Sequence, residues 1–201
     1  MIETISVENY IAPPVDYKSI YRYAQCPHPS KEVVNLVEEC IQTLNLTYKV
    51  CYREFDIQKR ENEIDLGFCS TDSKSLSQHL DGCDRIIVFT ATVGFDVDKL
   101  IMKYSKINPV KALIFQAVGT ERVESLCDVF EKGIKEKYLK SGQKTTPRFS
   151  PGYADLSLEM QKDIFRVLDC FNKIGVSLND SLLMTPSKSV TAIIGVKGTE
   201  K

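Results

Sequence analysis

The sequence has no long apolar run and no excess of charge of either sign. Its longest apolar stretch, residues 86–93, is interrupted by threonines and falls far short of the ~20 residues that a membrane-spanning helix needs. Lysine and arginine number 26 and the acidic residues 27, a formal net charge of −1, so no overall positive field attracts phosphate backbones or anionic lipid. The first residues also lack the basic start and apolar core of a signal peptide. We therefore expect a cytoplasmic protein with no membrane span and no nucleic-acid partner.

Local metal and redox motifs are missing as well. The seven cysteines are never closer than eleven positions, which excludes the CxxC pairs of zinc sites, iron–sulfur clusters and redox loops. Their odd number disfavours a disulfide framework, and Cys40 and Cys170 lie in apolar patterns where a free cysteine acts as a small hydrophobe. The only histidines, His28 and His79, are too far apart to bind one metal from a single helix. We expect no metal site.

The common catalytic signatures are absent too. The sequence contains no GxxxxGK[ST], GxGxxG, GxSxG or HExxH motif. It also has no serine or cysteine close to a histidine that would indicate an activated nucleophile. We therefore expect no catalytic residue set within this chain.

What the sequence does contain is a succession of amphipathic segments without a low-complexity linker or an internal repeat. Apolar residues at three- and four-residue spacing predict helices over 17–23, 30–44, 73–80, 96–104, 108–139 and 157–173. Ser30 can cap the second of these helices, and Asn108 followed by Pro109 is a typical helix start. Gly119 is a weak point in the long helix, and Gly175 closes the last one.

Alternating or β-branched apolar segments predict strands over 48–53, 64–68, 84–93, 176–184 and 189–196. The first two flank a polar connection and are expected to pair, and the last two to form a hairpin. The third is the most hydrophobic and should be the central strand, with helix 108–139 packed across it. Because the chain lacks a regular alternation of strands and helices, we predict a single α+β domain over residues 1–201, with an antiparallel or mixed sheet.

Two segments stand out as candidate ligand sites. Residues 90–94 form a strand-to-helix turn, a place where ligands often bind. Residues 148–153, Arg-Phe-Ser-Pro-Gly-Tyr, join a permanent cation to a rigid turn that carries an aromatic ring. This loop is either a plain Pro-Gly surface turn or a clamp in which arginine grips a carboxylate and tyrosine covers a ring or a sulfonium.

The sequence resembles the activation domain of cobalamin-dependent methionine synthase. The resemblance rests on residues 148–153, the helix that contains Gln161, residues 174–178 and residues 181–190, which agree in order and spacing. It is sharpest over about 50 residues, 148–195, and residues 90–94 are similar to the corresponding family segment. It implies an α+β fold with a twisted antiparallel sheet and long helices, in agreement with the segment pattern.

The resemblance also implies that the chain binds S-adenosylmethionine. In the family, the arginine of the RxxPGY motif holds the carboxylate of this ligand, and the backbone and tyrosine of the motif contact the rest. The matching residues of this sequence are Arg148, Ser150, Gly152 and Tyr153. The ligand ammonium requires an acidic partner, for which the nearest candidates are Glu121 and Glu124 on the long predicted helix. We assign Glu124 to the site.

The function that follows is a free-standing reactivation module. It would present S-adenosylmethionine to cob(II)alamin on a partner while a flavodoxin-like donor supplies the electron. The partner would be a methionine synthase without its own activation domain, or another corrinoid protein, and it would carry the cobalamin. Since the sulfonium is already a good leaving group, the chain would contribute positioning rather than an acid or a base.

Two other hypotheses remain. The sequence has no counterpart to the aromatic residues with which the family domain closes its ligand site toward the C-terminus. That difference favours a degenerate relative that no longer binds the ligand and serves as an interaction or assembly module for a corrinoid protein. The third hypothesis, a small-molecule methyltransferase, is disfavoured by the missing glycine-rich nucleotide loop.

Overall fold

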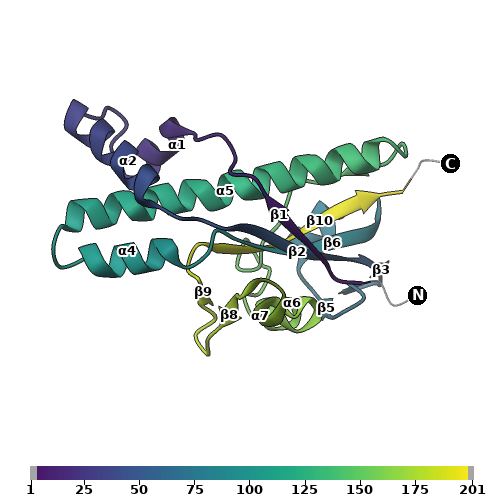
Figure 1. Ribbon diagram of the computed structural model, residues 1–201. Coiled ribbons are helices and arrows are strands. Elements are labelled where there is room, and N and C mark those ends of the chain that lie inside the picture. Colours follow the sequence, from purple (N-terminus) through teal and green to yellow (C-terminus); the bar gives the residue numbers. More distant parts are fainter. Residues whose placement is uncertain (1–3, 199–201) are drawn as a thin grey trace.

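The computed structural model describes residues 4–198, and a five-stranded antiparallel sheet runs through its centre (Figure 1). In spatial order, the strands are β1 (Ser6–Tyr10), β2 (Tyr48–Asp56), β6 (Cys83–Thr92), β10 (Ser189–Lys197) and β7 (Lys144–Thr145). β6 is the middle strand, and its seven residues from Ile86 to Thr92 are all buried. The α+β class and the interior position of residues 86–93 are therefore confirmed.

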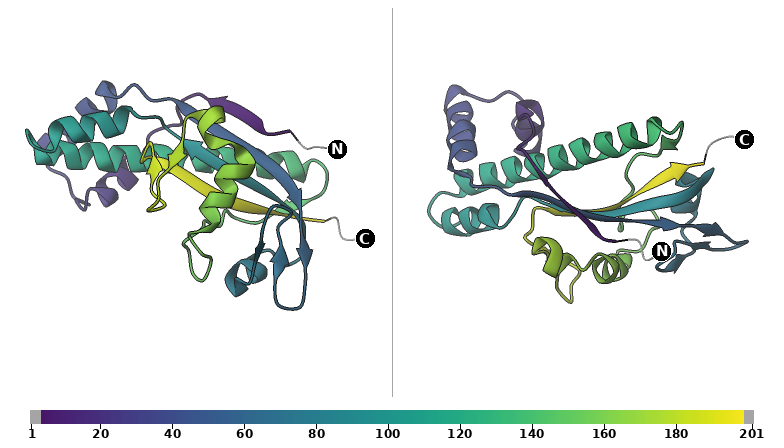
Figure 2. Two further views of the ribbon diagram at one scale, coloured as in Figure 1. Left: turned by 90° about the horizontal axis from the view of Figure 1, so that it is seen from below. Right: turned by 45° about the vertical axis from the view of Figure 1, so that its right-hand side comes forward.

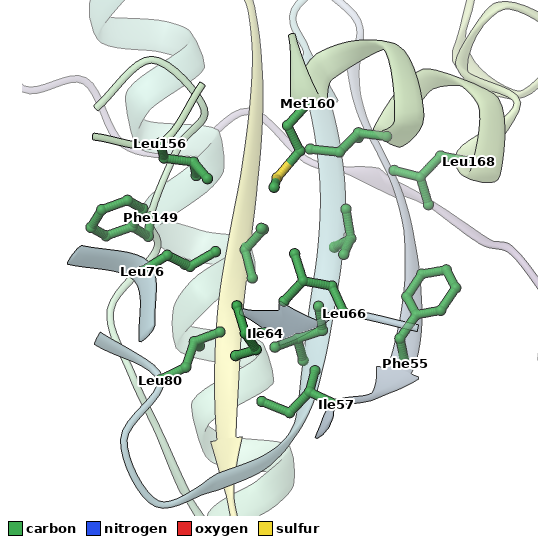
Figure 3. Packing of buried hydrophobic residues seen from close by; sticks show 14 of the residues in the cluster. Phe55, Ile57, Ile64, Leu66, Leu76, Leu80, Phe149, Leu156, Met160 and Leu168 are labelled. Carbon is green, nitrogen blue, oxygen red and sulfur yellow. The ribbon is translucent and has the colours of Figure 1, made fainter. Parts of the chain in front are cut away.

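Helices cover both faces of this sheet (Figure 2). The 31-residue α5 (Pro109–Leu139) crosses one face, where Phe89 and Phe130 pack together with ring centroids 4.7 Å apart. It starts as predicted, because the Asn108 side chain accepts a hydrogen bond from the backbone N–H of Lys111. α6 (Met160–Leu168) and α7 (Cys170–Ile174) cover the opposite face, above the apolar cluster that Figure 3 shows. The central sheet thus contributes to a core on each side.

Three shorter helices pack around the first half of α5: α1 (Tyr17–Tyr23), α2 (Lys31–Thr43) and α4 (Asp96–Tyr104). Asp16 caps α1, and Ser30 caps α2 as predicted. Gly119 does not break α5. Within residues 4–198, no helix combines the length and hydrophobicity needed to cross a lipid bilayer.

The expected pairing of residues 48–53 with 64–68 is wrong. β2 has β1 on one side and β6 on the other, so neither of its edges is open. Residues 64–68 contribute instead to a small separate sheet. The polar connection that was predicted between the two strands also contributes a strand to this sheet. Its strands are β3 (Gln58–Lys59), β4 (Ile64–Asp65) and β5 (Ser70–Thr71), and α3 (Lys74–His79) follows.

The expected hairpin of 176–184 with 189–196 is also wrong. β8 (Ser177–Leu178) pairs with β9 (Met184–Thr185), whereas β10 lies between β6 and β7. Apart from partly buried Val190 and Lys197, β10 is buried throughout, as is typical of an interior strand and not of a surface hairpin.

Residues 157–173 form two helices instead of one. The chain breaks at Asp169, whose φ of 48° lies in the left-handed region that aspartate tolerates better than most residues. The break turns both helices toward the sheet, so that Leu168 and Cys170 are both buried. As predicted, Gly175 ends the second helix, with a φ of 74°.

Candidate functional site

Residues 144–149 run beside β10 at the edge of the central sheet, and the candidate loop 148–153 begins there. After β7, Thr146 N–H donates to the Gly195 carbonyl (2.9 Å), and Phe149 and Ile193 form an antiparallel bridge. Side chains alternate along such an extended segment. Arg148 therefore reaches toward α5, while Phe149 packs into the cluster under α6.

Arg148 is held by three carboxylates of α5. Its Nη2 donates to Glu124 Oε2 (2.8 Å), and its Nη1 donates to Asp128 Oδ1 (2.7 Å) and Glu131 Oε2 (2.8 Å). The spacings of four and three residues place the acids on one face of the helix. Burial opposes the charge of the guanidinium, but the hydrogen bonds to Asp128 and Glu131 outweigh it and raise the pKa of Arg148. The arginine is a permanent cation with an excess of acidic neighbours.

A cavity of about 310 Å³ opens between α1, α5 and Arg148. More acidic than basic side chains line it, together with one aromatic ring: Asp16, Ser19, Arg22, Tyr23, Glu121, Glu124, Ser125, Asp128 and Arg148. A second cavity, of about 570 Å³, is lined by Asp128, Glu131, Lys132, Lys135, Pro147 and Arg148. Because Arg148 and Asp128 line both, the arginine stands at the border between them. Both volumes suit a small molecule, whose sites measure roughly 300–1,000 Å³.

The wall of the first cavity is fixed by a buried ion pair of two consecutive residues. Arg122 Nε donates to Glu121 Oε2 (2.5 Å), and its two Nη atoms donate to the carbonyls of Pro13 (2.7 Å) and Pro14 (2.9 Å). Glu121 Oε1 also accepts from the Asp16 backbone N–H (3.0 Å). This network fastens the segment before α1 to α5 and leaves Glu121 only 1% exposed.

Of the two candidate glutamates, Glu124 is the more exposed and the one that contacts Arg148. Its side chain is 39% exposed and reaches Arg148, whereas Glu121 is committed to Arg122 and the chain around Asp16.

The rest of the motif forms a tight turn beyond Arg148. The Tyr153 N–H donates to the Ser150 carbonyl (3.2 Å), and Gly152 has a φ of 85° that L-residues rarely adopt. The Tyr153 ring is 68% exposed and lies edge-on against Phe149, with centroids 5.5 Å apart. The structure thus joins Arg148 to Glu124, and places Tyr153 with Phe149, on the opposite side of the extended segment.

Asp155 anchors this turn to α3. Its carboxylate accepts from Ser73 Oγ (2.5 Å) and from the backbone N–H groups of Lys74 (2.9 Å) and Ser75 (3.2 Å). These hydrogen bonds, that from Ser73 first, lower the pKa of Asp155 to about 2.

Residues 90–94, the other candidate segment, contribute to packing. Thr92 is 1% exposed and its Oγ1 is hydrogen-bonded to Ser189 Oγ (2.9 Å). Gly94 has a φ of 84° and approaches Thr47 so closely that a Cβ atom would lie 2.6 Å from Thr47 Oγ1. Among residues 4–198, no group of three or more His, Cys, Asp or Glu side chains is arranged so that it could hold a metal ion.

Sequence reasoning missed Asp16 and Tyr23 on the α1 side of the cavity and Asp128 and Glu131 on α5. The two α5 acids carried a usable signal, since they share the helical face of Glu124. The α1 residues carried none, because they are more than 100 positions away from α5 residues that they meet in the fold.

Comparison with known proteins agrees with this fold. Residues 56–199 match the family model described as "Vitamin B12 dependent methionine synthase, activation domain". Among solved structures, the chain is similar to the MetH reactivation domain bound to AdoHcy, with a TM-score of 0.74 and 12% sequence identity, over 98% of this chain and 80% of that one. No curated protein matches the sequence significantly. Since the family match spans well over half of its length, the chain belongs to the family of activation domains of vitamin B12-dependent methionine synthase.

Proposed function

We propose that this chain binds S-adenosylmethionine beside Arg148 and supports reductive methylation of cobalamin on a partner protein. One observation carries the proposal: Arg148 stands at the border of two cavities, among three carboxylates, in a member of the activation-domain family. The structural neighbour was crystallised with AdoHcy, the demethylated product of the proposed ligand.

The charges of the site complement those of the ligand. S-adenosylmethionine carries a carboxylate, an ammonium and a sulfonium, and thus one more positive than negative charge. The guanidinium of Arg148 can hold the carboxylate in a bidentate fork. The acids that now surround Arg148 would then turn toward the two ligand cations, with Glu124 facing the ammonium.

The motif residues beyond Arg148 would shape the other side of the site. We assign the backbone of Ser150 and Gly152 to hydrogen bonding, and Tyr153 to covering the ligand. Because Tyr153 lines neither cavity and packs against Phe149, it would cover the ligand from the far side of the turn. Tyr23 lines the first cavity and is a competing aromatic contact for the sulfonium or the adenine. Comparing Tyr153→Ala with Tyr23→Ala decides which ring contacts the ligand, because only the ring in contact should weaken binding when removed.

The contribution of this chain to the reaction is positioning. The methyl group is bound to a sulfonium, which would leave as a neutral thioether when the S–C bond breaks, and the reduced cobalt of the partner would act as the nucleophile that takes the methyl group. Holding the carboxylate, the ammonium and the ring at three separate points fixes the direction in which the methyl group points. No residue needs to move a proton in this step.

The partner would be a methionine synthase without its own activation domain, or another corrinoid protein, with a flavodoxin-like protein as electron donor. The chain would then act in trans as a free-standing module. All seven cysteines are unbridged, which is typical of a reducing compartment, and we place the protein in the cytoplasm.

Recovery of methylcobalamin on a partner trapped as cob(II)alamin tests this function. With S-adenosylmethionine and a reductant, wild-type protein should restore the visible spectrum of methylcobalamin, and Tyr153→Ala should slow this recovery more than it lowers folding stability. Equal recovery with wild type, with Tyr153→Ala and with no added protein contradicts the proposal.

That result would favour the second candidate, an interaction module for a corrinoid protein that does not bind the ligand. One observation speaks for this candidate: the charge of Arg148 is already fully compensated by acids of its own chain.

A further inference from the structure

The buried face of the sheet under α7 holds two cysteines side by side. Cys51 lies on β2 and Cys170 is the first residue of α7, and they are 0% and 1% exposed. Their side chains are hydrogen-bonded to each other. Cys170 Sγ is also hydrogen-bonded to Thr90 Oγ1 (3.3 Å), and Thr90 is the cross-strand partner of Cys51. Strand pairing and the break before α7 therefore bring together two sulfur atoms from residues 119 positions apart in the sequence.

We propose that Cys51 and Cys170 form a reversible disulfide when the protein meets a peroxide, and that Cys170 is the thiol that reacts first. Nothing in this proposal depends on the binding of S-adenosylmethionine. It uses a part of the molecule that lies on the α6–α7 side of the sheet, whereas Arg148 and its acids lie on the α5 side.

The contacts of the two thiols divide their roles. Hydrogen bonding of Cys51 and of the Thr90 hydroxyl to the Cys170 sulfur lowers the pKa of Cys170. The same hydrogen bond and burial raise the pKa of Cys51. Burial, the largest cause in both cases, raises the pKa of Cys40 to about 11 and that of Cys69 to about 12. Because the thiolate is the nucleophilic form, Cys170 is the one suited to attack.

Cys170 borders a cavity at the surface. It lines a cavity of about 450 Å³ together with Phe165, Arg166, Phe171 and Val176. Lys162 and Asp169 also line this cavity, and the carboxylate of Asp169 opposes the negative charge of a Cys170 thiolate. Cys51 does not line this cavity, so we expect peroxide to meet Cys170 first.

The chemistry is a two-electron oxidation in two displacements. The Cys170 thiolate attacks one oxygen of hydrogen peroxide, the O–O bond breaks, and the leaving hydroxide takes a proton to become water. Cys170 is then a sulfenic acid. The Cys51 sulfur attacks this sulfur, the S–O bond breaks, and the second oxygen leaves as water with the Cys51 proton. The two thiols lose two electrons and two protons, and the peroxide is reduced to two waters.

Peptide mapping of the wild-type protein tests the link directly. After exposure to peroxide, remaining thiols are alkylated under denaturing conditions without reductant, and the protein is cut with trypsin. Cleavage after Lys49, Arg53, Arg166 and Lys173 releases Cys51 in peptide 50–53 and Cys170 in peptide 167–173. We expect a linked species two hydrogens lighter than the sum of the two peptides, which disappears after treatment with a reductant.

Three variants test the roles. In Cys51→Ser, the sulfenic acid of Cys170 should persist and be trapped by dimedone on peptide 167–173. In Cys170→Ser, no dimedone adduct should form on peptide 50–53. Cys40→Ser removes a buried cysteine from another cluster and should leave the link unchanged.

Two results would overturn the proposal. One is full alkylation of both peptides at a peroxide dose that oxidises the partly exposed Cys26. The other is a dimedone adduct on Cys51 in place of Cys170, which would reverse the assigned order.

Discussion

At the scale of single residues, the site combines what the sequence can show with what only the fold can assemble. The RxxPGY motif led to Arg148 as a candidate. The sequence placed Glu124 at the same site but did not reveal that Asp128 and Glu131 also meet Arg148, because helical spacing shows which acids share a face and not what that face meets. Nor could it show Tyr23 on the cavity wall, since only tertiary packing brings α1 to α5.

Asp155 gives a pH-dependent prediction at this scale. Its folded-state pKa, about 2, lies below the ordinary value of 3.8, so the carboxylate stabilises the fold above about pH 4. That contribution is lost as the pH falls from about 4 to about 2. We expect Asp155→Asn to lower the melting temperature near neutral pH and to flatten the decline of melting temperature in this acidic interval.

Melting curves recorded from pH 2 to pH 7 measure this difference. Asp72→Asn, which alters an exposed aspartate just before α3, should retain the wild-type profile. An unchanged acidic decline in Asp155→Asn would show that the hydrogen bonds to Ser73 and Lys74 do not stabilise the turn.

At the scale of elements, local sequence signals correctly predicted where helices begin. Asn108 with Pro109 and Ser30 as a cap defined helix starts that the structure confirms. The errors concern pairing partners. A short alternating segment such as 64–68 indicates that a strand forms, but not which strand it pairs with. β2 could not be the partner, because β1 and β6 already occupy both of its edges. The sequence pattern did not predict the break at Asp169, because the helical spacing of apolar residues continues across it.

Gly119 is the clearest prediction within an element. In a helix interior alanine is usually better than glycine by about 1 kcal/mol. At position 119, however, a Cβ atom would lie 2.7 Å from Val97 Cγ1 and 3.0 Å from Lys188 Cγ. Because Val97 is fully buried and cannot easily move, we expect Gly119→Ala to lower the free energy of unfolding by roughly 1–3 kcal/mol.

Gly133 on the same helix is the matched control. A Cβ atom there would meet nothing within 4 Å. Gly133→Ala should therefore raise the free energy of unfolding by about 0.5–1 kcal/mol in urea titrations. If both alanines stabilised the protein equally, the close packing of α4 and Lys188 against α5 would be wrong.

At the scale of the whole molecule, the sheet and α5 connect every part of the core. The sheet belongs to the clusters on both of its faces, and α5 belongs to two clusters, one against the sheet and one against α1 and α2. The family model matches from residue 56. β1 lies wholly before that residue and β2 ends at it, yet both strands belong to the central sheet. The elements from both sides of residue 56 therefore share one core.

This arrangement predicts that residues 1–201 unfold as one domain. We expect a single cooperative transition in urea, with coincident curves from far-ultraviolet circular dichroism and from the fluorescence of the nine tyrosines. Four tyrosines, at positions 10, 17, 21 and 23, lie before residue 24. An earlier fluorescence transition would therefore indicate that the N-terminal elements fold separately, contrary to this expectation.

The central claim is that Arg148 is the anchor of an S-adenosylmethionine site, and calorimetric titration with this ligand tests it most directly. We predict binding to the wild type and a loss of about 1.5–3 kcal/mol of binding free energy in Arg148→Ala, the usual scale for hydrogen bonds to a charged group. Arg148→Lys keeps the charge but not the bidentate fork, and should also weaken binding. Arg60→Ala removes an exposed arginine that is also paired with two carboxylates, and should bind like the wild type. No heat and no thermal stabilisation of the wild type at millimolar ligand, or equal affinities for the wild type and both Arg148 variants, would contradict the claim.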